Sequence, residues 1–172
     1  INQIAFENVP IETPEALAAL RATGKLPFDQ LPLLEINGLK LSQSSAMIRY
    51  LARLGGFYGE SDSDAVWCDM IAGAAADFAE TSMQAAFQPT ENIVIAALCS
   101  RIEKFVLKFE TCMDKSGLGF CVGGRITFAD VVLTEALCAY LEWCPDILGD
   151  TPLLDALHKR VSNDPGIASY LH

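Results

Sequence analysis

The stretch FDQLPLLEINGLKLSQSSAMIRYLARLGG, residues 28–56, decides the fold of the first part of the chain. Its apolar segment 31–38 predicts a β-strand that closes on Asn37-Gly38, a dipeptide suited to a two-residue hairpin turn because both positions adopt positive φ. Residues 39–43 are expected to form the antiparallel partner. A helix should follow from Ser44 or Ser45, and Gly55-Gly56 should end it.

The residues before this stretch predict one more strand and one more helix. Residues 4–11 alternate apolar and polar side chains, which is typical of a half-buried strand. Thr13 then supplies an N-cap with Pro14 at the first helical position, and Gly24 ends that helix. The order strand, helix, hairpin, helix predicts the later part of a thioredoxin-like unit. Such a unit needs one more parallel strand and helix ahead of Ile1, because a βαβ crossover passes through a helix.

From residue 64 onward the pattern is helical. Apolar residues at 67, 70, 71, 74 and 78 have the spacing of one helical face. The most apolar helix should be central and buried. We predict long helices over 64–87, 92–115 and 128–144 (the most apolar), a shorter one over 152–161, and a turn at 164–166. The expected organisation is an α/β domain over 1–56, a linker over 57–63 and an all-helical domain over 64–172.

The composition fits a globular protein and argues against several kinds of partner. Of 172 residues 51% are hydrophobic, which is enough to bury a core, and the formal net charge is −10. A strongly acidic surface repels nucleic-acid phosphates and anionic membranes. No apolar run is long enough for a transmembrane helix, and no signal peptide is visible. We therefore expect a cytoplasmic protein with neither nucleic acid nor membrane as partner.

Six cysteines are present, and none forms a CxxC pair. With only two histidines in the chain, a metal site is not expected. Most of the cysteines lie in apolar helical patterns such as LTEALCAYLEWC, 133–144, where a free thiol acts as a small hydrophobe. An even count also permits disulfides. We expect free thiols in a reducing compartment.

Two short motifs flank the predicted hairpin, and each has a structural and a functional interpretation. Pro32 removes a ladder donor at a strand entrance, which fits a turn, an edge or a cis bond that presents the backbone of Leu31 to a peptide-like ligand. Ser44 suits an N-cap, but a helix N-terminus beside Gln43 also suits a ligand carboxylate. Taken singly, the turn and the cap are the better explanations.

A third motif is structural. Thr127 and Asp130 have the spacing of a capping box at the start of the apolar helix, whose end donors would otherwise lie unsatisfied in the interior. Loss of either residue should cost about 1 kcal/mol or more. We therefore exclude both from the binding site.

Together the motifs resemble the cytosolic glutathione transferases. Residues 28–59 are similar to the glutathione-binding segment of that family, with QLP, the hairpin, the QS pair and the helix in the same order. Residues 55–78 resemble the family's linker and first helix of the second domain, and residues 120–142 resemble its buried capping box and central helix. The pattern is most similar to the sigma, pi, alpha and mu group, and to sigma within it. The resemblance implies a partial thioredoxin-like domain followed by the family's all-helical domain.

The resemblance also implies roles for individual residues. Leu31, ahead of a cis Pro32, would pair through its backbone with the cysteinyl part of glutathione. Gln43 and Ser44 would hold the γ-glutamyl carboxylate, and Gln30 would stand near the glycyl end.

Three further positions carry two interpretations each. Arg21 would be the basic residue that grips the glycyl carboxylate, which requires a small insertion in the stretch ATGK, residues 22–25. Asp77 would reach a neighbouring subunit's γ-glutamyl amino group, or simply lie on a solvated helix face. Phe28 would be an aromatic key between subunits, or a core aromatic.

The implied activity is that of a homodimeric transferase with glutathione as co-substrate and small hydrophobic electrophiles as substrates. A prostaglandin isomerase is a variant of this, and a non-catalytic, crystallin-like or glutathione-binding relative is the alternative. Met83, Phe87 and the tail Tyr170-Leu171 are pocket candidates by position. In such relatives a tyrosine at the end of the first strand activates the thiol. None of the four tyrosines here matches it, so we name no catalytic residue: the first strand lies upstream of Ile1, or the protein lacks it.

Overall fold

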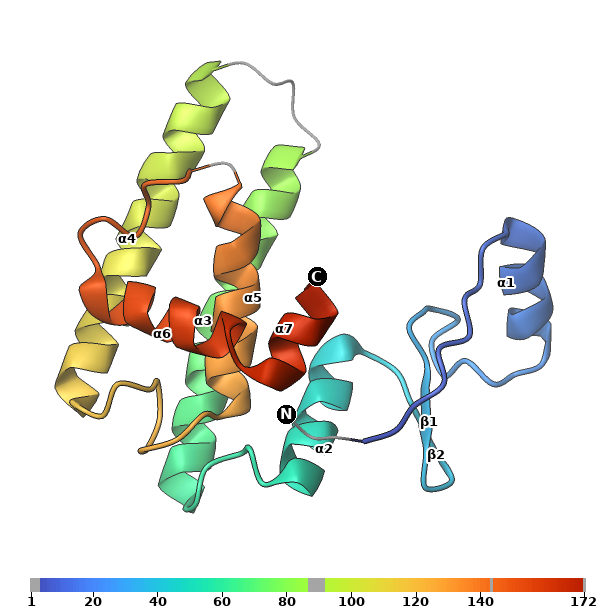
Figure 1. The fold of residues 1–172 in the computed structure, drawn as a ribbon. Helices are drawn as coiled ribbons and strands as arrows, with labels where there is room; N and C mark the ends of the chain where they lie inside the picture. The colour runs from blue at the N-terminus through green and yellow to red at the C-terminus, as the bar shows by residue number, and fades with distance from the viewer. Residues whose placement is uncertain (1–3, 87–91, 143, 172) are drawn as a thin grey trace. The chain divides into compact units, whose positions relative to one another are not determined.

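In the computed structural model two units are distinguished, one ending at Gly55 and the other beginning at Gly56 (Figure 1). The structure describes residues 4–86, 92–142 and 144–171, with side chains omitted at 81–98, 100–101 and 170–171. The pocket candidates Met83, Phe87, Tyr170 and Leu171 therefore lie outside the described side chains. No helix among the described residues is long and apolar enough to cross a membrane.

The first unit begins with helix α1, Pro14–Ala22, which starts and ends as predicted. The Thr13 hydroxyl accepts a hydrogen bond from the Ala16 N–H at 3.1 Å, and Pro14 occupies the first turn, where its missing donor is not needed. Gly24 follows the helix with a φ of 65°. The positive φ turns the chain away from the helix axis at no steric cost.

The hairpin and the next helix follow as predicted, with shorter strands. Strand β1, Leu34–Ile36, pairs antiparallel with β2, Leu39–Leu41, so that Leu34 lies opposite Leu41. Asn37 and Gly38 have φ values of 50° and 77°, as a two-residue turn of this kind requires. Helix α2 spans Ser44–Gly55.

The strand predicted over residues 4–11 is wrong. These residues form neither a strand nor a helix, and Phe6 and Val9 are 78% and 67% exposed. Alternation of side chains shows only that a segment could be half buried, whereas a strand also needs a neighbour for its ladder. The sheet formed by the described residues contains β1 and β2 alone.

The second unit is all-helical, and its four predicted helices are confirmed. The elements are α3, Asp62–Ala86; α4, Asn92–Ser116; α5, Phe128–Leu141; α6, Pro152–Ser162; and α7, Pro165–Leu171. Helix α5 packs against α3 and α6, and α4 packs against the same two helices (Figure 1). As predicted, α5 is buried at most of its positions.

Helix α7 occupies the segment where a turn was expected. The carbonyl of Asp164 accepts hydrogen bonds from the N–H groups of Ile167 and Ala168, and its carboxylate accepts one from Gly166. Pro165 begins this helix, because proline is tolerated at the first helical position. The sequence Asp-Pro-Gly therefore opens a last helix here.

The buried face of α3 differs from the predicted one. Cys68, Ile71 and Phe78 are buried, whereas Trp67 and Met70 are 47% and 55% exposed. The helix carries apolar residues on two adjacent stripes, and periodicity alone does not say which stripe meets the core. Two of the five predicted positions, Trp67 and Met70, are therefore exposed.

The core between α3 and α5 is aromatic. The rings of Phe78 and Tyr140 lie 4.1 Å apart at their centroids, and Phe105 and Phe109 from α4 lie against Phe78. The Tyr140 hydroxyl donates to the carbonyl of Phe78, which gives this buried phenol its partner.

The capping box at the start of α5 is confirmed. The fully buried Asp130 carboxylate accepts from the N–H and the hydroxyl of Thr127 and from the Cys121 N–H, each at 2.7 Å. It therefore closes the end of α5 and also fixes the preceding loop.

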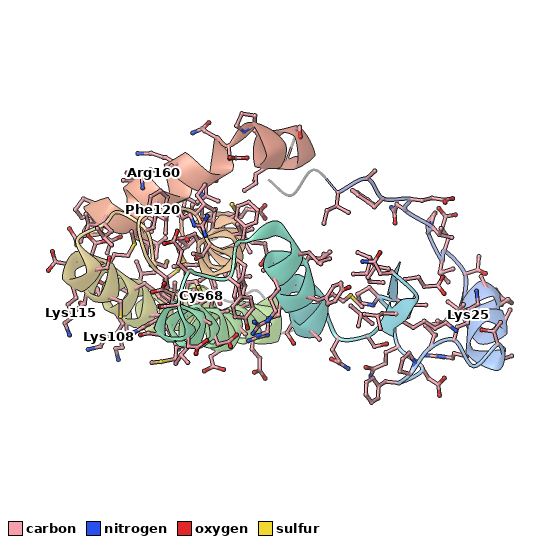
Figure 2. The ribbon with its side chains drawn as sticks, turned by 90° about the horizontal axis from the view of Figure 1, so that it is seen from below. Lys25, Cys68, Lys108, Lys115, Phe120 and Arg160 are labelled. Atoms are coloured by element: carbon pink, nitrogen blue, oxygen red, sulfur yellow. A yellow bond between two sulfur atoms is a disulfide. The ribbon has the colours of Figure 1, made fainter. Side chains whose placement is uncertain are left out.

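Helix α6 is capped from a distance. The two carboxylate oxygens of Glu110 on α4 accept from the N–H groups of Leu153 and Leu154 at 2.9 and 2.8 Å. Pro152 has no N–H, so these two donors are the first that α6 offers. Farther along α6, the Arg160 guanidinium lies 4.7 Å from the Phe120 ring centroid and donates to the carbonyl of Gly119, so this helix also holds the loop before α5 (Figure 2).

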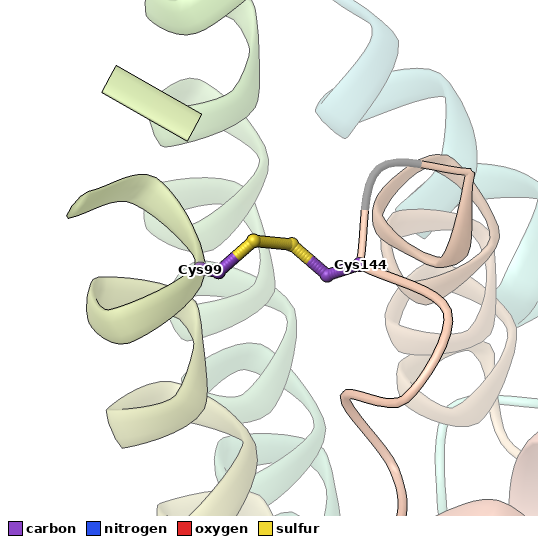
Figure 3. The surroundings of a disulfide bond; sticks show 2 residues. All are labelled: Cys99 and Cys144. Atoms are coloured by element: carbon purple, nitrogen blue, oxygen red, sulfur yellow. A yellow bond between two sulfur atoms is a disulfide. The ribbon is translucent and has the colours of Figure 1, made fainter. Parts of the chain in front are cut away.

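The expectation that the cysteines are all free is wrong for one pair. Cys99 on α4 and Cys144 after α5 form a disulfide, with Cα atoms 6.3 Å apart (Figure 3). The partners are separated by 45 positions, so local pattern does not indicate their pairing. Cys68, Cys112, Cys121 and Cys138 are free. Burial raises the pKa of the Cys68 and Cys121 thiols, as expected of cysteines that serve as core residues.

Candidate functional site

The candidate binding residues of the first unit gather at the ends of the hairpin. Gln30 precedes β1 and Gln43 follows β2, so the antiparallel pairing brings their backbones together. Their side chains meet: the Gln43 amide nitrogen lies 3.3 Å from the Gln30 amide oxygen. Two residues that sequence reasoning assigned to different parts of one ligand are therefore neighbours.

The entrance to β1 has the expected backbone. The Leu31-Pro32 peptide bond is cis, and the Leu31 side chain is 42% exposed. Pro32 has no N–H and so cannot donate to a ladder hydrogen bond. Leu31 lies before it, three positions ahead of the hairpin ladder, which begins at Leu34.

The N-terminus of α2 lies directly beside Gln43. The backbone carbonyl of Gln43 accepts hydrogen bonds from the N–H groups of Ala46 and Met47. Gln43 therefore occupies the cap position and Ser44 the first helical position. The first N–H groups of a helix have no acceptor within it, and the helix dipole places partial positive charge there. Gln43 has a φ of 71°, and its side chain and that of Ser44 are exposed. The arrangement suits a carboxylate.

Arg21 is held near Gln30 by a contact that sequence reasoning missed. Its Nε donates to the carbonyl of Asp29 at 2.8 Å, and Asp29 has a φ of 54°. A guanidinium has further N–H donors beyond Nε. Aspartate is one of the residues that tolerate this left-handed conformation, but the sequence FDQ gives no sign that an arginine eight residues earlier binds there.

Asp77 lies in the other unit, on α3. It is exposed and shares one helical stripe with Val66, Met70 and Gly73, at intervals of three and four positions. Phe28 in the first unit is 63% exposed, so it is not a core aromatic within this chain.

The hydroxyl groups of two tyrosines are engaged in the helical unit. The Tyr58 hydroxyl donates to the Asp69 carboxylate at 2.7 Å, and the Tyr140 hydroxyl donates to the Phe78 carbonyl, both within the helical unit. Tyr50 is half-buried on α2. No catalytic residue is assigned among the described side chains.

An α/β unit of this kind followed by a helical unit defines a thioredoxin-like protein with an all-helical second domain. Comparison with known families makes this specific. Residues 2–53 match the glutathione S-transferase N-terminal domain, and residues 76–172 match the glutathione S-transferase C-terminal domain. The chain therefore belongs to the glutathione S-transferase family, whose co-substrate is glutathione.

Individual relatives agree. The chain is 33% identical to a glutathione S-transferase of Gallus gallus and to glutathione S-transferase alpha-3 of Rattus norvegicus, each over 171 residues that cover 98% of this chain and 77% of the relative. The crystal structure of the glutathione S-transferase from Ascaris lumbricoides superposes with a TM-score of 0.85 at 30% identity, covering 98% of this chain and 84% of that one. These relatives include alpha-class proteins, so the sigma-like subclass stays a prediction.

Proposed function

We propose that this chain binds glutathione at the hairpin ends of its first unit and transfers the glutathione thiol to small hydrophobic electrophiles in the cytoplasm. Such conjugation makes apolar compounds more polar and is a detoxification reaction. The observation that carries the proposal is the contact between Gln30 and Gln43, beside the α2 N-terminus and the cis bond at Pro32.

The ligand would lie across three backbone features of the first unit. Its γ-glutamyl carboxylate would accept hydrogen bonds from Ser44 and the Gln43 amide, where the α2 dipole favours negative charge. Its cysteinyl part would pair with the Leu31 backbone, which lies three positions before the first ladder residue, Leu34. Its glycyl end would meet Gln30, and Arg21, which donates to the carbonyl of the preceding residue Asp29, would supply a nearby positive charge.

The chemistry needs the thiolate. A free thiol has a pKa of about 8.5, so the enzyme must stabilise the deprotonated form with a hydrogen-bond donor and nearby positive dipoles. The α2 N-terminus contributes a dipole at the γ-glutamyl end, and the donor to sulfur is left unassigned.

We further propose that the protein is a homodimer that uses the exposed stripe of α3. Val66, Trp67 and Met70 are 57%, 47% and 55% exposed, and together they form an apolar patch on a helix. Contiguous exposed apolar residues mark protein interfaces. Asp77 continues the same stripe, from which it would reach the γ-glutamyl amino group in the partner's site. Met70→Glu should convert the dimer to a monomer in sedimentation, whereas Leu118→Glu, at a 56% exposed residue in the loop after α4, should not.

Calorimetric titration with glutathione tests the binding site. The native chain should bind, and Ser44→Ala should weaken binding several-fold through loss of a hydrogen bond to a charged group. Ser63→Ala is the matched control, because Ser63 is exposed in the first turn of α3 and should leave affinity unchanged.

Two results would separate the alternatives. No binding by the native chain would mean that the motif serves only as scaffold. Binding without conjugation of 1-chloro-2,4-dinitrobenzene would favour the non-catalytic glutathione-binding relative.

A further inference from the structure

The Cys99–Cys144 disulfide lines a hollow in the helical unit. The hollow has a volume of about 530 Å³ and lies between one face of α4 and the loop that joins α5 to α6. Figure 3 shows the bond spanning the space between α4 and the segment after α5. A volume of this size falls within the range of about 300–1,000 Å³ found for small-molecule sites. The hollow is therefore large enough to admit a small reagent beside the two cysteines that line it.

The two sulfur-bearing residues differ in exposure. Cys99 is half-buried, whereas Cys144 is 7% exposed. An incoming nucleophile therefore has easier access to Cys99.

The charged side chains among the described lining residues are all acidic, and the other lining residues are apolar or neutral. Glu103 on α4 and Asp146 and Asp150 on the loop line it, and all three are exposed. None of the described residues that line it is a lysine, arginine or histidine. Three carboxylates around one space produce a negative potential, and the net charge of −10 adds to it.

Disulfides are opened by thiolates, so the charge of the attacking molecule matters. Thiol–disulfide exchange proceeds by attack of a thiolate on one sulfur, and its rate depends on access as well as on nucleophilicity. A thiolate on an anionic body is repelled from an acidic hollow, and one on a cationic body is attracted to it. The effect of exposed charges weakens as salt screens them.

We propose that the Cys99–Cys144 disulfide is a thiol-exchange site that admits cationic and neutral thiols and disfavours anionic ones. The incoming thiolate forms a bond to Cys99 Sγ while the Cys99–Cys144 bond breaks and its electron pair leaves on Cys144 Sγ. A second thiolate then attacks the mixed disulfide. The protein cystine gains two electrons, the two small thiols are oxidised to one disulfide, and solvent protonates the two cysteine thiolates.

The acidic lining has a consequence for a member of this family. Glutathione carries two carboxylates and one ammonium group, so the co-substrate is an anion and its thiolate is more negative still. The site therefore discriminates kinetically against glutathione, the co-substrate of this family, and glutathione should open the disulfide more slowly than a cationic thiol of equal intrinsic reactivity.

The first test counts thiols. Denatured, unreduced protein treated with iodoacetamide should gain four carbamidomethyl groups, because four of the six cysteines are free. Six groups would contradict the proposal at once.

The second test measures the rate of disulfide opening in the native protein. The reductants are 2-aminoethanethiol, 2-mercaptoethanol and 2-mercaptoethanesulfonate, with glutathione as a further anion. Each rate is divided by the rate of the same thiol on bis(2-hydroxyethyl) disulfide, which removes the thiol's own pKa and nucleophilicity. At 10 mM salt the normalised rate of 2-aminoethanethiol, the cation, should exceed that of 2-mercaptoethanesulfonate, the anion, by about five- to ten-fold. At 0.5 M salt the ratio of the two normalised rates should approach one.

Variants assign the effect to the hollow. The triple variant Glu103→Gln, Asp146→Asn, Asp150→Asn should bring the ratio close to one at low salt. A control triple variant changes the net charge by the same amount at exposed residues outside the hollow: Asp114→Asn, Glu35→Gln and Glu12→Gln. It should keep most of the rate ratio between the cationic and the sulfonate thiol. A ratio near one in the native protein, or an unchanged ratio in the triple variant, would overturn the proposal. Should the triple variant fail to fold, the salt dependence of the native protein decides alone.

Discussion

The two units of this chain differ in what their side chains are used for. Among the described residues, the buried apolar side chains of the first unit are Leu26, Met47 and Ala52, whereas those of the helical unit include the fully buried Leu133, Leu137 and Tyr140. Conversely, the side chains at the hairpin ends, Gln30, Gln43 and Ser44, are exposed. Burial provides stability, whereas ligand binding requires groups that remain accessible. The helical unit thus provides most of the core, and the first unit keeps exposed the polar side chains of the proposed glutathione site.

The largest expected change in the free energy of unfolding comes from comparing one leucine substitution in each unit. Leu137→Ala at a fully buried position of α5 should lower the free energy of unfolding by about 4 kcal/mol, because it removes buried methyl groups and leaves a cavity. Leu39→Ala in β2, where the side chain is 44% exposed, should cost less than about 1 kcal/mol. Urea denaturation followed by circular dichroism measures both. Equal losses of stability in the two variants would contradict the view that the helical unit provides most of the core.

The second effect concerns a polar residue of the helical core. Asp130→Ala should lower stability by about 3 kcal/mol, because three hydrogen bonds to the buried carboxylate are lost and their donors stay buried. Asp114→Ala, at an exposed residue of α4, should change stability by less than about 0.5 kcal/mol. Denaturation curves are compared at neutral pH. A small loss for Asp130→Ala would show that water replaces the carboxylate.

The third effect tests the distant cap of α6. Glu110→Ala should cost about 1.5 kcal/mol, since the N–H groups of Leu153 and Leu154 lose their acceptors. Glu110→Gln keeps an amide oxygen and should lose less. Glu103→Ala on the same helix serves as control, because Glu103 is exposed and makes no such cap. If Glu110→Ala, Glu110→Gln and Glu103→Ala lower the free energy of unfolding equally, the cap does not contribute to stability.

The smallest effect is a pH dependence in the helical unit. Burial lowers the pKa of His158 below its usual value, although Asp155 acts in the opposite direction. The folded state therefore binds this proton less readily than the unfolded state. The associated stability is fully present above the ordinary histidine pKa of about 6.5 and decreases as pH falls below it. Thermal unfolding between pH 7.5 and 5 should show this slope in the native chain and a shallower one in His158→Gln. Identical slopes would exclude His158 as the cause.

Much of the fold could be predicted because its signals are local. Thr13-Pro14, Asn37-Gly38 and the Thr127 and Asp130 pair each fix their own backbone through a short-range hydrogen bond or a required φ. The errors concern partners that lie far away in the sequence. Residues 4–11 alternate like a strand but have no ladder neighbour, and α3 has two apolar stripes of which only packing against α5 selects one.

The candidate site shows the same division. The motif QLP and the pair Gln43-Ser44 could be read from the sequence because they are contiguous, and the contact of Gln30 with Gln43 follows from the hairpin. The bond from Arg21 to Asp29 depends on a left-handed backbone that no residue type enforces there. The Cys99–Cys144 pairing depends on how α4 and the chain after α5 pack.

The cap on α6 has a consequence for amide hydrogen exchange. The second and third N–H groups of a helix have no acceptor within it, and where no side chain caps them they bond to water and exchange rapidly with solvent deuterium. In α6 those of Leu153 and Leu154 are bound to a carboxylate on another helix, and Leu154 is fully buried. Their deuterium uptake therefore reports the loss of the Glu110 contact between α4 and the first turn of α6. Two backbone amides at a helix start thus become probes of a tertiary contact.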